Sequence, residues 1–246
     1  MSQLHRRQTR QVHVRGVAIG GGAPVTVQAM TKTDTRDVES TVAQVKALSE
    51  HGAAIVRLAV PDIEAAEALK EIRRRVDVPL VADIHFDHTL ALESLKAGVD
   101  KLRINPGNLG ERSRLLAVAR EARGRGVPIR VGINAGSLER DILQRHGAPT
   151  AEALSESALR NVQLLQDTGF EDIVISVKSS DVTTCVSAYR MVASKCDFPL
   201  HVGITETGPG IRGLIKSAAG IGALLLEGIG DTVRLSLTGP PEDEVV

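Results

Sequence analysis

Short aliphatic runs recur eight times along the chain, each with polar or charged residues at or near its C-terminal end. Helical spacing follows nearly every run. Aliphatic runs of this length, bounded by glycine, proline or polar residues, are typical of buried parallel strands. We expect strands at residues 25–30, 54–60, 80–86, 101–107, 129–137, 172–180, 200–208 and 232–237. Eight strands alternating with helices predict an α/β chain folded as one (β/α)₈ TIM barrel.

The segments between the strands complete this expectation. Helices are expected at residues 38–51, 62–75, 89–97, 111–125, 151–168, 182–195 and 211–226. Weak alternation over residues 11–19 predicts an N-terminal β-hairpin, turning at Arg15-Gly16 or in the following glycine run, that plugs the barrel floor. The 138–149 insert is longer than its counterparts, which indicates a lid or a part of the site.

The predicted domains are a hairpin over residues 1–24, a substrate-binding barrel over 25–237 and a truncated start of helix eight over 238–246. In that last segment prolines precede acids and apolar residues, as in the first turn of a helix. The eighth helix therefore begins without being completed. We expect the chain to be a fragment of a longer protein, of natural or artificial origin.

Composition narrows the function classes. Lys plus Arg equals Asp plus Glu at 30 each, aromatic residues make up 2% and Trp is absent, which argues against nucleic-acid and membrane partners. The chain has no bilayer-length apolar run and no signal-peptide pattern, so we expect a cytoplasmic location. Arg6, Arg7, Arg10 and Arg15 make the N-terminus basic, which predicts a solvated arm. Only Cys185 and Cys196 are present, which excludes a disulfide framework and predicts two small buried side chains.

Polar side chains two residues apart on one strand share a face. The aliphatic residues between them, such as Ile84, Ile104 and Val177, are expected to face the helices, so the polar set points into the barrel. Arg57 joins this set if the same register holds. The expected inward-facing binding residues are Arg57, Asp83, His85, Arg103, Asn105, Arg130, Asn134, Lys178, Arg234 and Ser236.

This inward set is strongly basic although the chain as a whole is neutral. Five cations converge against few acids, chiefly Asp83 and Glu206. Buried cations need counter-charges, and arginine forks match phosphate oxygens in pairs. A small polyanion, best a diphosphate, is therefore the predicted ligand. The alternative is internal ion pairing within the barrel, for which too few acids are available.

The glycine-rich stretch 205–213 and the pair Asp83 and His85 each allow more than one interpretation. The glycine-rich stretch 205–213 follows strand seven and opens a helix, where barrels often bind phosphate, although it could be a simple turn. Its Glu206 could donate or steer a proton beside a bound diphosphate, or merely suit the helix dipole. Asp83 and His85, with His201 as the one convincing partner, have the residue types of a metal site. We favour roles for Asp83 and His85 in orienting substrate or an arginine, count His201 among the substrate-binding residues, and expect no metal.

Several ordered stretches resemble one known family. They are VQAMT at 27–31, ADIHF at 82–86, LRINPGN at 102–108, RVGINAGS at 130–137, SVKSS at 176–180 and HVGITE at 201–206. Together they are similar to the 4-hydroxy-3-methylbut-2-enyl diphosphate synthases over essentially the whole chain. The resemblance implies an oxidoreductase of the non-mevalonate isoprenoid pathway that reductively opens 2-C-methyl-D-erythritol 2,4-cyclodiphosphate in two one-electron steps.

The resemblance also implies site residues and partners. The diphosphate would be held by Arg57, Arg103, Asn105, Arg130, Asn134, Lys178, Arg234 and Ser236, with Glu206 as the acid partner. The family is a homodimer that takes electrons from ferredoxin or flavodoxin. Its [4Fe-4S] cluster is held by three cysteines and a glutamate in a C-terminal domain that is absent here, and Cys185 and Cys196 do not match that motif. We therefore expect this chain alone to bind substrate without turnover.

Two other functions remain open at this point. One is a non-redox barrel of the dihydropteroate synthase type, which also holds a diphosphate, although the chain lacks a convincing Asp and Asn set for a pterin ring. The other is a stand-alone binding module. Competition between a pterin diphosphate and the cyclic diphosphate would separate the first alternative from the family function.

Overall fold

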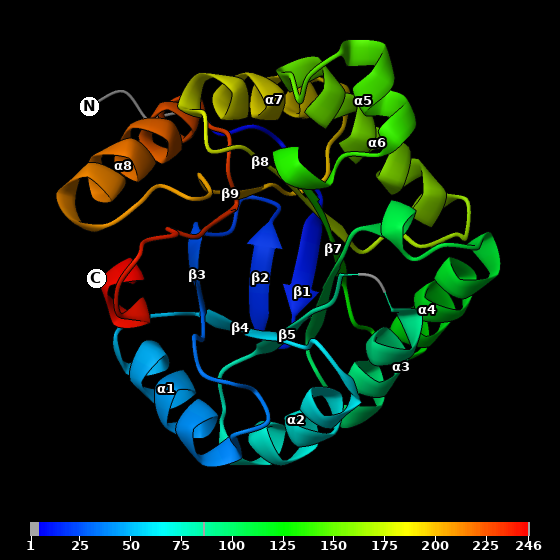
Figure 1. Cartoon of the computed structure of the whole chain (residues 1–246), viewed down its shortest axis with the longest axis vertical. Helices are drawn as coiled ribbons and strands as arrows, with labels where there is room; N and C mark the ends of the chain where they lie inside the picture. The colour runs from blue at the N-terminus through cyan, green and yellow to red at the C-terminus, as the bar shows by residue number, and fades with distance from the viewer. Residues whose placement is uncertain (1–4, 86, 246) are drawn as a thin grey trace.

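A computed structural model describes residues 5–85 and 87–245. Its centre is a ring of eight parallel strands in the order β8-β7-β6-β5-β4-β3-β10-β9, and a bridge between Ile175 and Leu200 closes the ring (Figure 1). The strands are β3 (Thr26–Met30), β4 (Ile55–Ala59), β5 (Leu80–Asp83), β6 (Lys101–Ile104), β7 (Ile129–Asn134), β8 (Ile173–Lys178), β9 (His201–Val202) and β10 (Thr232–Val233). The predicted TIM barrel is thus confirmed.

Two strands are much shorter than predicted, because β9 and β10 end at Val202 and Val233. The polar residues expected at their ends lie in loops. Gly203 follows β9 at a point where a Cβ atom would lie 2.4 Å from the Arg234 carbonyl oxygen. The two chains therefore approach too closely there for any residue but glycine.

Helices surround the ring on the outside (Figure 1). Aspartates begin several of them: Asp62 accepts a hydrogen bond from the Ala65 amide at 2.9 Å, and Asp181 from the Thr184 amide at 2.7 Å. The helices are α1 (Val38–Glu50), α2 (Ile63–Arg75), α3 (His88–Ala97), α4 (Arg112–Gly124), α5 (Arg140–His146), α6 (Ala151–Gln166), α7 (Val182–Lys195) and α8 (Gly210–Leu226), with 3₁₀ turns η1 (Pro106–Asn108), η2 (Ala135–Ser137) and η3 (Pro241–Glu244).

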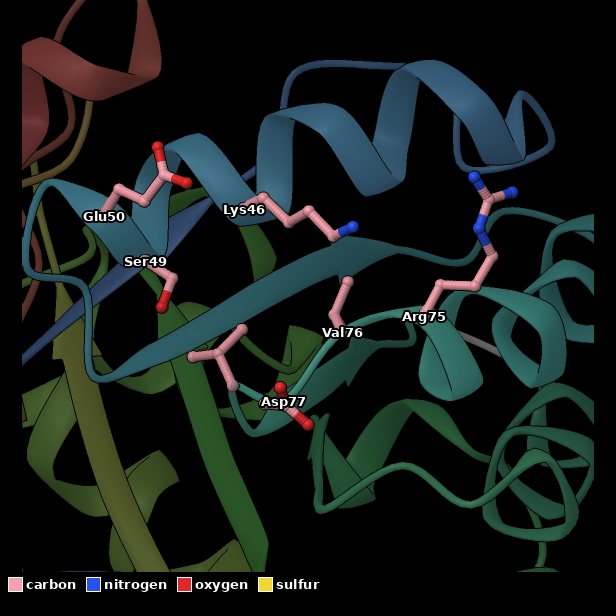
Figure 2. A pocket seen from close by; sticks show the side chains of 7 residues that line it. Lys46, Ser49, Glu50, Arg75, Val76 and Asp77 are labelled. Carbon is pink, nitrogen blue, oxygen red and sulfur yellow. The ribbon is translucent and has the colours of Figure 1, made fainter.

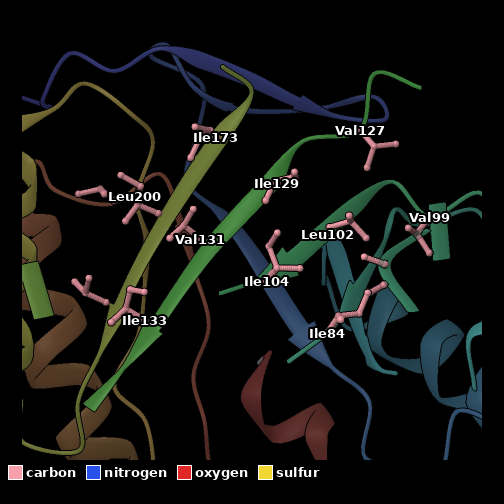
Figure 3. Packing of buried hydrophobic residues seen from close by; sticks show 14 of the residues in the cluster. Ile84, Val99, Leu102, Ile104, Val127, Ile129, Val131, Ile133, Ile173 and Leu200 are labelled. Atoms are coloured by element: carbon pink, nitrogen blue, oxygen red, sulfur yellow. The ribbon is translucent and has the colours of Figure 1, made fainter. Parts of the chain in front are cut away.

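The main core lies between the strands and the helices. Figure 3 shows Ile104, Val131 and Ile133 among the aliphatic side chains that project from the strands into this layer. All three are fully buried. The predicted division is confirmed: aliphatic positions face the helices, which leaves the alternate positions to the barrel interior.

A β-hairpin closes one end of the barrel, as predicted. Strands β1 (Gln11–Val14) and β2 (Val17–Gly20) pair antiparallel around Arg15-Gly16 and cross the barrel in Figure 1. Val14 and Ile19 pack against Ile55 and Val81, which lie early in β4 and β5. The floor of the barrel is therefore an apolar plug.

The basic N-terminal segment is bound to the floor, so the prediction of a solvated arm is wrong. Arg6 donates to the carbonyl oxygens of Ala23 at 2.7 Å and Gly230 at 2.9 Å. Arg10 pairs with Asp197 and lies 4.3 Å from the ring centre of Phe198. Carbonyl groups left unpaired at loop turns need donors, and the arginines provide them.

The 138–149 insert, expected to be a lid or a part of the site, packs against a neighbouring helix. Within the 138–149 insert, α5 packs on α6, where Ser157 donates to Glu139 at 2.6 Å and His146 bonds to Glu156 at 2.8 Å.

The short turn η3 lies between α8 and α1, beside β3 (Figure 1). This is the gap that a helix after β10 would occupy.

A candidate anion-binding site at the barrel mouth

A pocket of about 160 Å³ lies at the C-terminal ends of the barrel strands, opposite the hairpin. In TIM barrels this end carries the active site. Eight predicted binding residues line it together with Ser176 and Thr205. The full lining is Arg57, Asp83, His85, Arg103, Arg130, Asn134, Ser176, Lys178, Thr205 and Arg234.

Strand register places these side chains. Arg103 of β6 lies opposite Arg130 of β7, and Asn134 of β7 lies opposite Lys178 of β8. Gly132 leaves room for the Arg103 side chain, because a Cβ atom at Gly132 would lie 2.3 Å from Arg103 Nε. The Arg103 fork also donates to the Gly132 carbonyl oxygen at 3.2 Å.

Among the described residues, Asp83 is the one acid that lines the pocket. Its carboxylate accepts a hydrogen bond from Arg103 Nη1 at 3.0 Å and lies 3.6 Å from Arg57 Nε. Burial alone would raise the pKa of Asp83, but Arg57, His85 and Arg103 outweigh it and hold the pKa well below its usual value. Asp83 therefore stays ionised and fixes the arginine on either side.

Besides its ion pair with Asp83, Arg57 contacts a weak acceptor. Its Nε and Nη2 lie 3.1 and 2.8 Å from the Met30 sulfur, which is a poor acceptor. Burial lowers the pKa of Arg57 to about 10, partly offset by Asp83. A phosphate oxygen would be a far better acceptor than a thioether at this position.

Arg130 and Lys178 lack any counter-ion within the described residues. Arg130 is 1% exposed and donates one hydrogen bond, to Ser176 Oγ at 2.8 Å, while its Nε and Nη2 have no partner there. Burial, reinforced by neighbouring arginines, lowers the pKa of both Arg130 and Lys178 well below their usual values. Desolvated cations in this state attract an anion strongly.

The other predicted binding residues are not among those that line the pocket. Asn105 and His201 are 3% and 0% exposed, and all of their side-chain polar atoms lack partners among the described residues. Ser236 is half-buried, and its carbonyl oxygen accepts a hydrogen bond from Thr207 at 2.6 Å. Glu206 is exposed on the loop after β9 with a backbone φ of 52°, a conformation uncommon outside glycine.

Two charged groups near the site were missed in the sequence. Lys101 is fully buried on the same face of β6 as Arg103, and its Nζ has no partner among the described residues. Its spacing of two from Arg103 could have revealed it. Glu244 of η3 pairs with Arg234 at 2.9 Å, a contact between residues ten apart that no strand pattern signals.

The residues present do not fit an iron–sulfur cluster. Cys185 is buried near the start of α7 with its thiol on the Val177 carbonyl oxygen, and Cys196 caps the other end. Eleven residues of helix separate them by roughly 16 Å. Across the described positions, no three His, Cys, Asp or Glu side chains gather as a metal site.

A second hollow of similar size lies outside the barrel, between α1 and the residues after α2 (Figure 2). Its charged lining residues are Lys46, Glu50, Arg75 and Asp77, so the signs balance. Arg75 already pairs with Glu39. This surface lacks the unpaired charge that marks the barrel mouth.

Fold and pocket together define a TIM-barrel domain with a cationic mouth. The chain belongs to the GcpE TIM-barrel domain family, which matches residues 9–246. The family resemblance seen in the sequence is thereby confirmed.

Similar proteins agree with this assignment. Relatives from Thermodesulfovibrio yellowstonii and Symbiobacterium thermophilum are 55% and 56% identical over 242 residues, and both are named 4-hydroxy-3-methylbut-2-en-1-yl diphosphate synthase (flavodoxin). The matches cover 98% of this chain and 69% and 65% of those relatives, so the chain spans about two thirds of their length.

Solved structures with the same fold include dihydropteroate synthase from Stenotrophomonas maltophilia. It superposes with a TM-score of 0.65 over 94% of this chain and 93% of that one, at 14% identity. A likeness at this identity establishes the barrel and carries no information about substrate. In the part of the chain that is described, every helix is too short or too polar to cross a membrane.

Proposed function

We propose that the barrel mouth binds 2-C-methyl-D-erythritol 2,4-cyclodiphosphate, the substrate whose reduction gives 4-hydroxy-3-methylbut-2-enyl diphosphate. The proposal rests on one observation above all. Arg130 and Lys178 are buried at the mouth without a carboxylate partner among the described residues. Such cations are costly in an empty site and are stabilised when a polyanion enters.

The composition of the pocket favours two phosphates over one carboxylate. Five cationic side chains line it, and Asp83 is the single acid among the lining residues. Asp83 forms ion pairs with Arg103 and Arg57. Arg103 Nε and Arg234 Nε remain without partners among the described residues. Forked guanidinium groups at several angles suit the oxygens of a cyclic diphosphate.

The chain's own residues divide into binding and proton-handling roles. The arginines and Lys178 bind and orient the diphosphate, and Asn134 and Ser176 offer neutral hydrogen bonds beside them. Glu206, on the loop above, is the proposed acid partner that donates or steers a proton as the substrate loses water. From its exposed position Glu206 would reach a ligand from the rim of the mouth.

The electrons must come from elsewhere. Since Cys185 and Cys196 do not fit a cluster, we propose that this chain alone binds substrate without turnover. A one-electron donor, flavodoxin as in the relatives' names or ferredoxin, and a homodimer complete the proposed system. A turnover assay with a one-electron reductant tests this: product formed by the isolated chain would overturn it.

Calorimetric titration with the cyclic diphosphate tests the binding proposal. We expect saturable one-to-one binding that weakens as salt rises, because charge pairing dominates. Arg130→Met should weaken binding about 100-fold, since a charge-assisted contact contributes about 2.7 kcal/mol. The matched control is Arg120→Met, which removes an exposed arginine of α4 and should leave affinity unchanged. Equal effects of the two variants would refute the assignment.

Competition with a pterin diphosphate addresses the alternative function. The shared fold with dihydropteroate synthase gives it no residue-level support. We expect inorganic diphosphate to compete with the cyclic substrate and the pterin compound to gain nothing from its ring. Tighter binding of the pterin compound than of inorganic diphosphate would favour a non-redox barrel instead.

A further inference from the structure

A buried carboxylate at the edge of the pocket has no part in the function proposed so far. Glu244 is 3% exposed, yet it lies on η3, a four-residue turn on the outside of the barrel. Burying a carboxylate costs several kcal/mol unless it is paired and hydrogen-bonded. Its partners therefore indicate why it is there.

The two carboxylate oxygens of Glu244 contact different partners. Oε2 accepts a hydrogen bond from Nη2 of Arg234, which lines the pocket, at 2.9 Å. Oε1 accepts one from the Leu237 amide at 3.1 Å and lies 3.3 Å from Lys32 Nζ. One oxygen thus binds a site arginine, and the other binds the loops around it.

Lys32 completes a clamp between the first and last strands of the barrel. It follows β3, and its ammonium group donates to the carbonyl oxygens of Leu237 and Gly239 beyond β10. Glu244 and Lys32 therefore hold the loop after β3 against the loop after β10. Arg234 lies immediately beside that seam.

We propose that Glu244 is a positioning residue that holds the Arg234 guanidinium in place at the pocket before the diphosphate arrives. The inference rests on the proposed function, because it assumes that Arg234 binds the diphosphate. With Nη2 fixed by Glu244, Arg234 cannot swing away, and its Nε, which lacks a partner among the described residues, is left for the ligand. Preorganised donors lose less entropy when they bind.

Two other roles predict different results. If Glu244 were simply a counter-ion that competes with the ligand for Arg234, removing its charge would tighten anion binding. If it only stabilised the η3 turn, affinity would not change in the folded protein. Positioning instead predicts weaker binding, and the loss should depend on Arg234.

The test is calorimetric titration of the full chain with inorganic diphosphate. Glu244→Gln keeps the shape and an acceptor for the Leu237 amide, and we expect it to weaken binding about fivefold; Glu244→Ala should weaken it about tenfold. Asp243→Ala removes the exposed neighbouring acid of the same turn and should change nothing. Thermal melting verifies that each variant is folded at the assay temperature.

A double-mutant cycle makes the result specific. In an Arg234→Met background, Glu244→Gln should cause no further loss, because the group it positions is gone. Tighter binding by Glu244→Gln, or an equal loss in both backgrounds, would overturn the positioning role. Failure of the unmodified chain to bind diphosphate would instead refute the proposed function and leave the contacts of Glu244 as purely structural.

Discussion

The two ends of the barrel differ in how completely their arginines are paired: Arg103 and Arg234 of the mouth have carboxylate partners, but other donors there have none among the described residues. At the floor, Arg6 donates to two carbonyl oxygens and to Asp231, and Arg10 pairs with two carboxylates. At the mouth, Arg57 faces a thioether and Arg130 keeps two nitrogens without partners among the described residues. Arginine side chains therefore stabilise the fold at the floor, and at the mouth we propose that they bind a ligand.

This difference predicts that stability and binding can be separated. Loss of a floor contact should lower stability and leave affinity alone. Loss of a mouth cation should lower affinity and leave stability unchanged or improved, as is common when a strained functional site is relieved.

Arg130→Met should give the largest effect. We expect diphosphate affinity to fall about 100-fold, and the free energy of unfolding of the ligand-free protein to stay level or rise by up to about 1 kcal/mol, because a buried unpaired charge is removed. Calorimetry and denaturant unfolding measure the two quantities. A large loss of stability would contradict the claim that this cation serves the ligand.

Asp231→Asn is the opposite experiment, at the floor. Asp231 accepts hydrogen bonds from the Leu200 amide at 2.8 Å and from Thr9 and Arg6 at 3.2 Å. Losing this buried charge should lower the free energy of unfolding by about 2 kcal/mol. Diphosphate affinity should remain within about twofold of the original, since the contact lies at the far end of the barrel. Weakened binding in the folded variant would undermine the separation.

Gly132→Ala tests packing inside the mouth. The added methyl group would lie 2.3 Å from Arg103 Nε, so the guanidinium must move. We expect affinity to fall about tenfold, since a small displacement of a charge-assisted donor forfeits much of its contact. Gly136→Ala is the control, because a Cβ atom there meets nothing within 4 Å. Similar affinities for the two variants would mean that Arg103 does not touch the ligand.

The smallest expected effect is on pH dependence. Burial, with Arg130 and Arg234 nearby, lowers the pKa of Lys178 well below its usual value, and a bound anion should raise it again. Binding therefore takes up protons at pH values between the free and bound pKa, and affinity should fall as pH rises through that range. Titration in buffers of different ionisation enthalpy measures the uptake, which Lys178→Met should abolish. Proton release would contradict the sign.

The sequence predicted the barrel and most of its inward-facing charges because strand periodicity is local. Arg103 and Lys178 lie where alternation places them. Contacts between distant segments were not predictable in the same way. The docking of Arg6 on Gly230, and of Glu244 on Arg234, depends on how loops meet after the ring closes.

The short strands β9 and β10 show the same limit. Their flanking residues are polar and β-compatible, so the pattern continued the strands to residues 208 and 237. In the folded chain the ladder stops at Val202 and Val233, and Thr207 further along donates to the Ser236 carbonyl oxygen. Where strand pairing ends depends on how the two segments meet in space, which periodicity does not register.

The decisive experiment is a crystal structure of the chain with 2-C-methyl-D-erythritol 2,4-cyclodiphosphate bound. We expect phosphate oxygens in hydrogen-bond contact with Arg130 and Lys178, and an oxygen replacing the Met30 sulfur at Arg57. A diphosphate bound elsewhere on the chain, with Arg130 still unpaired inside the barrel, would contradict it.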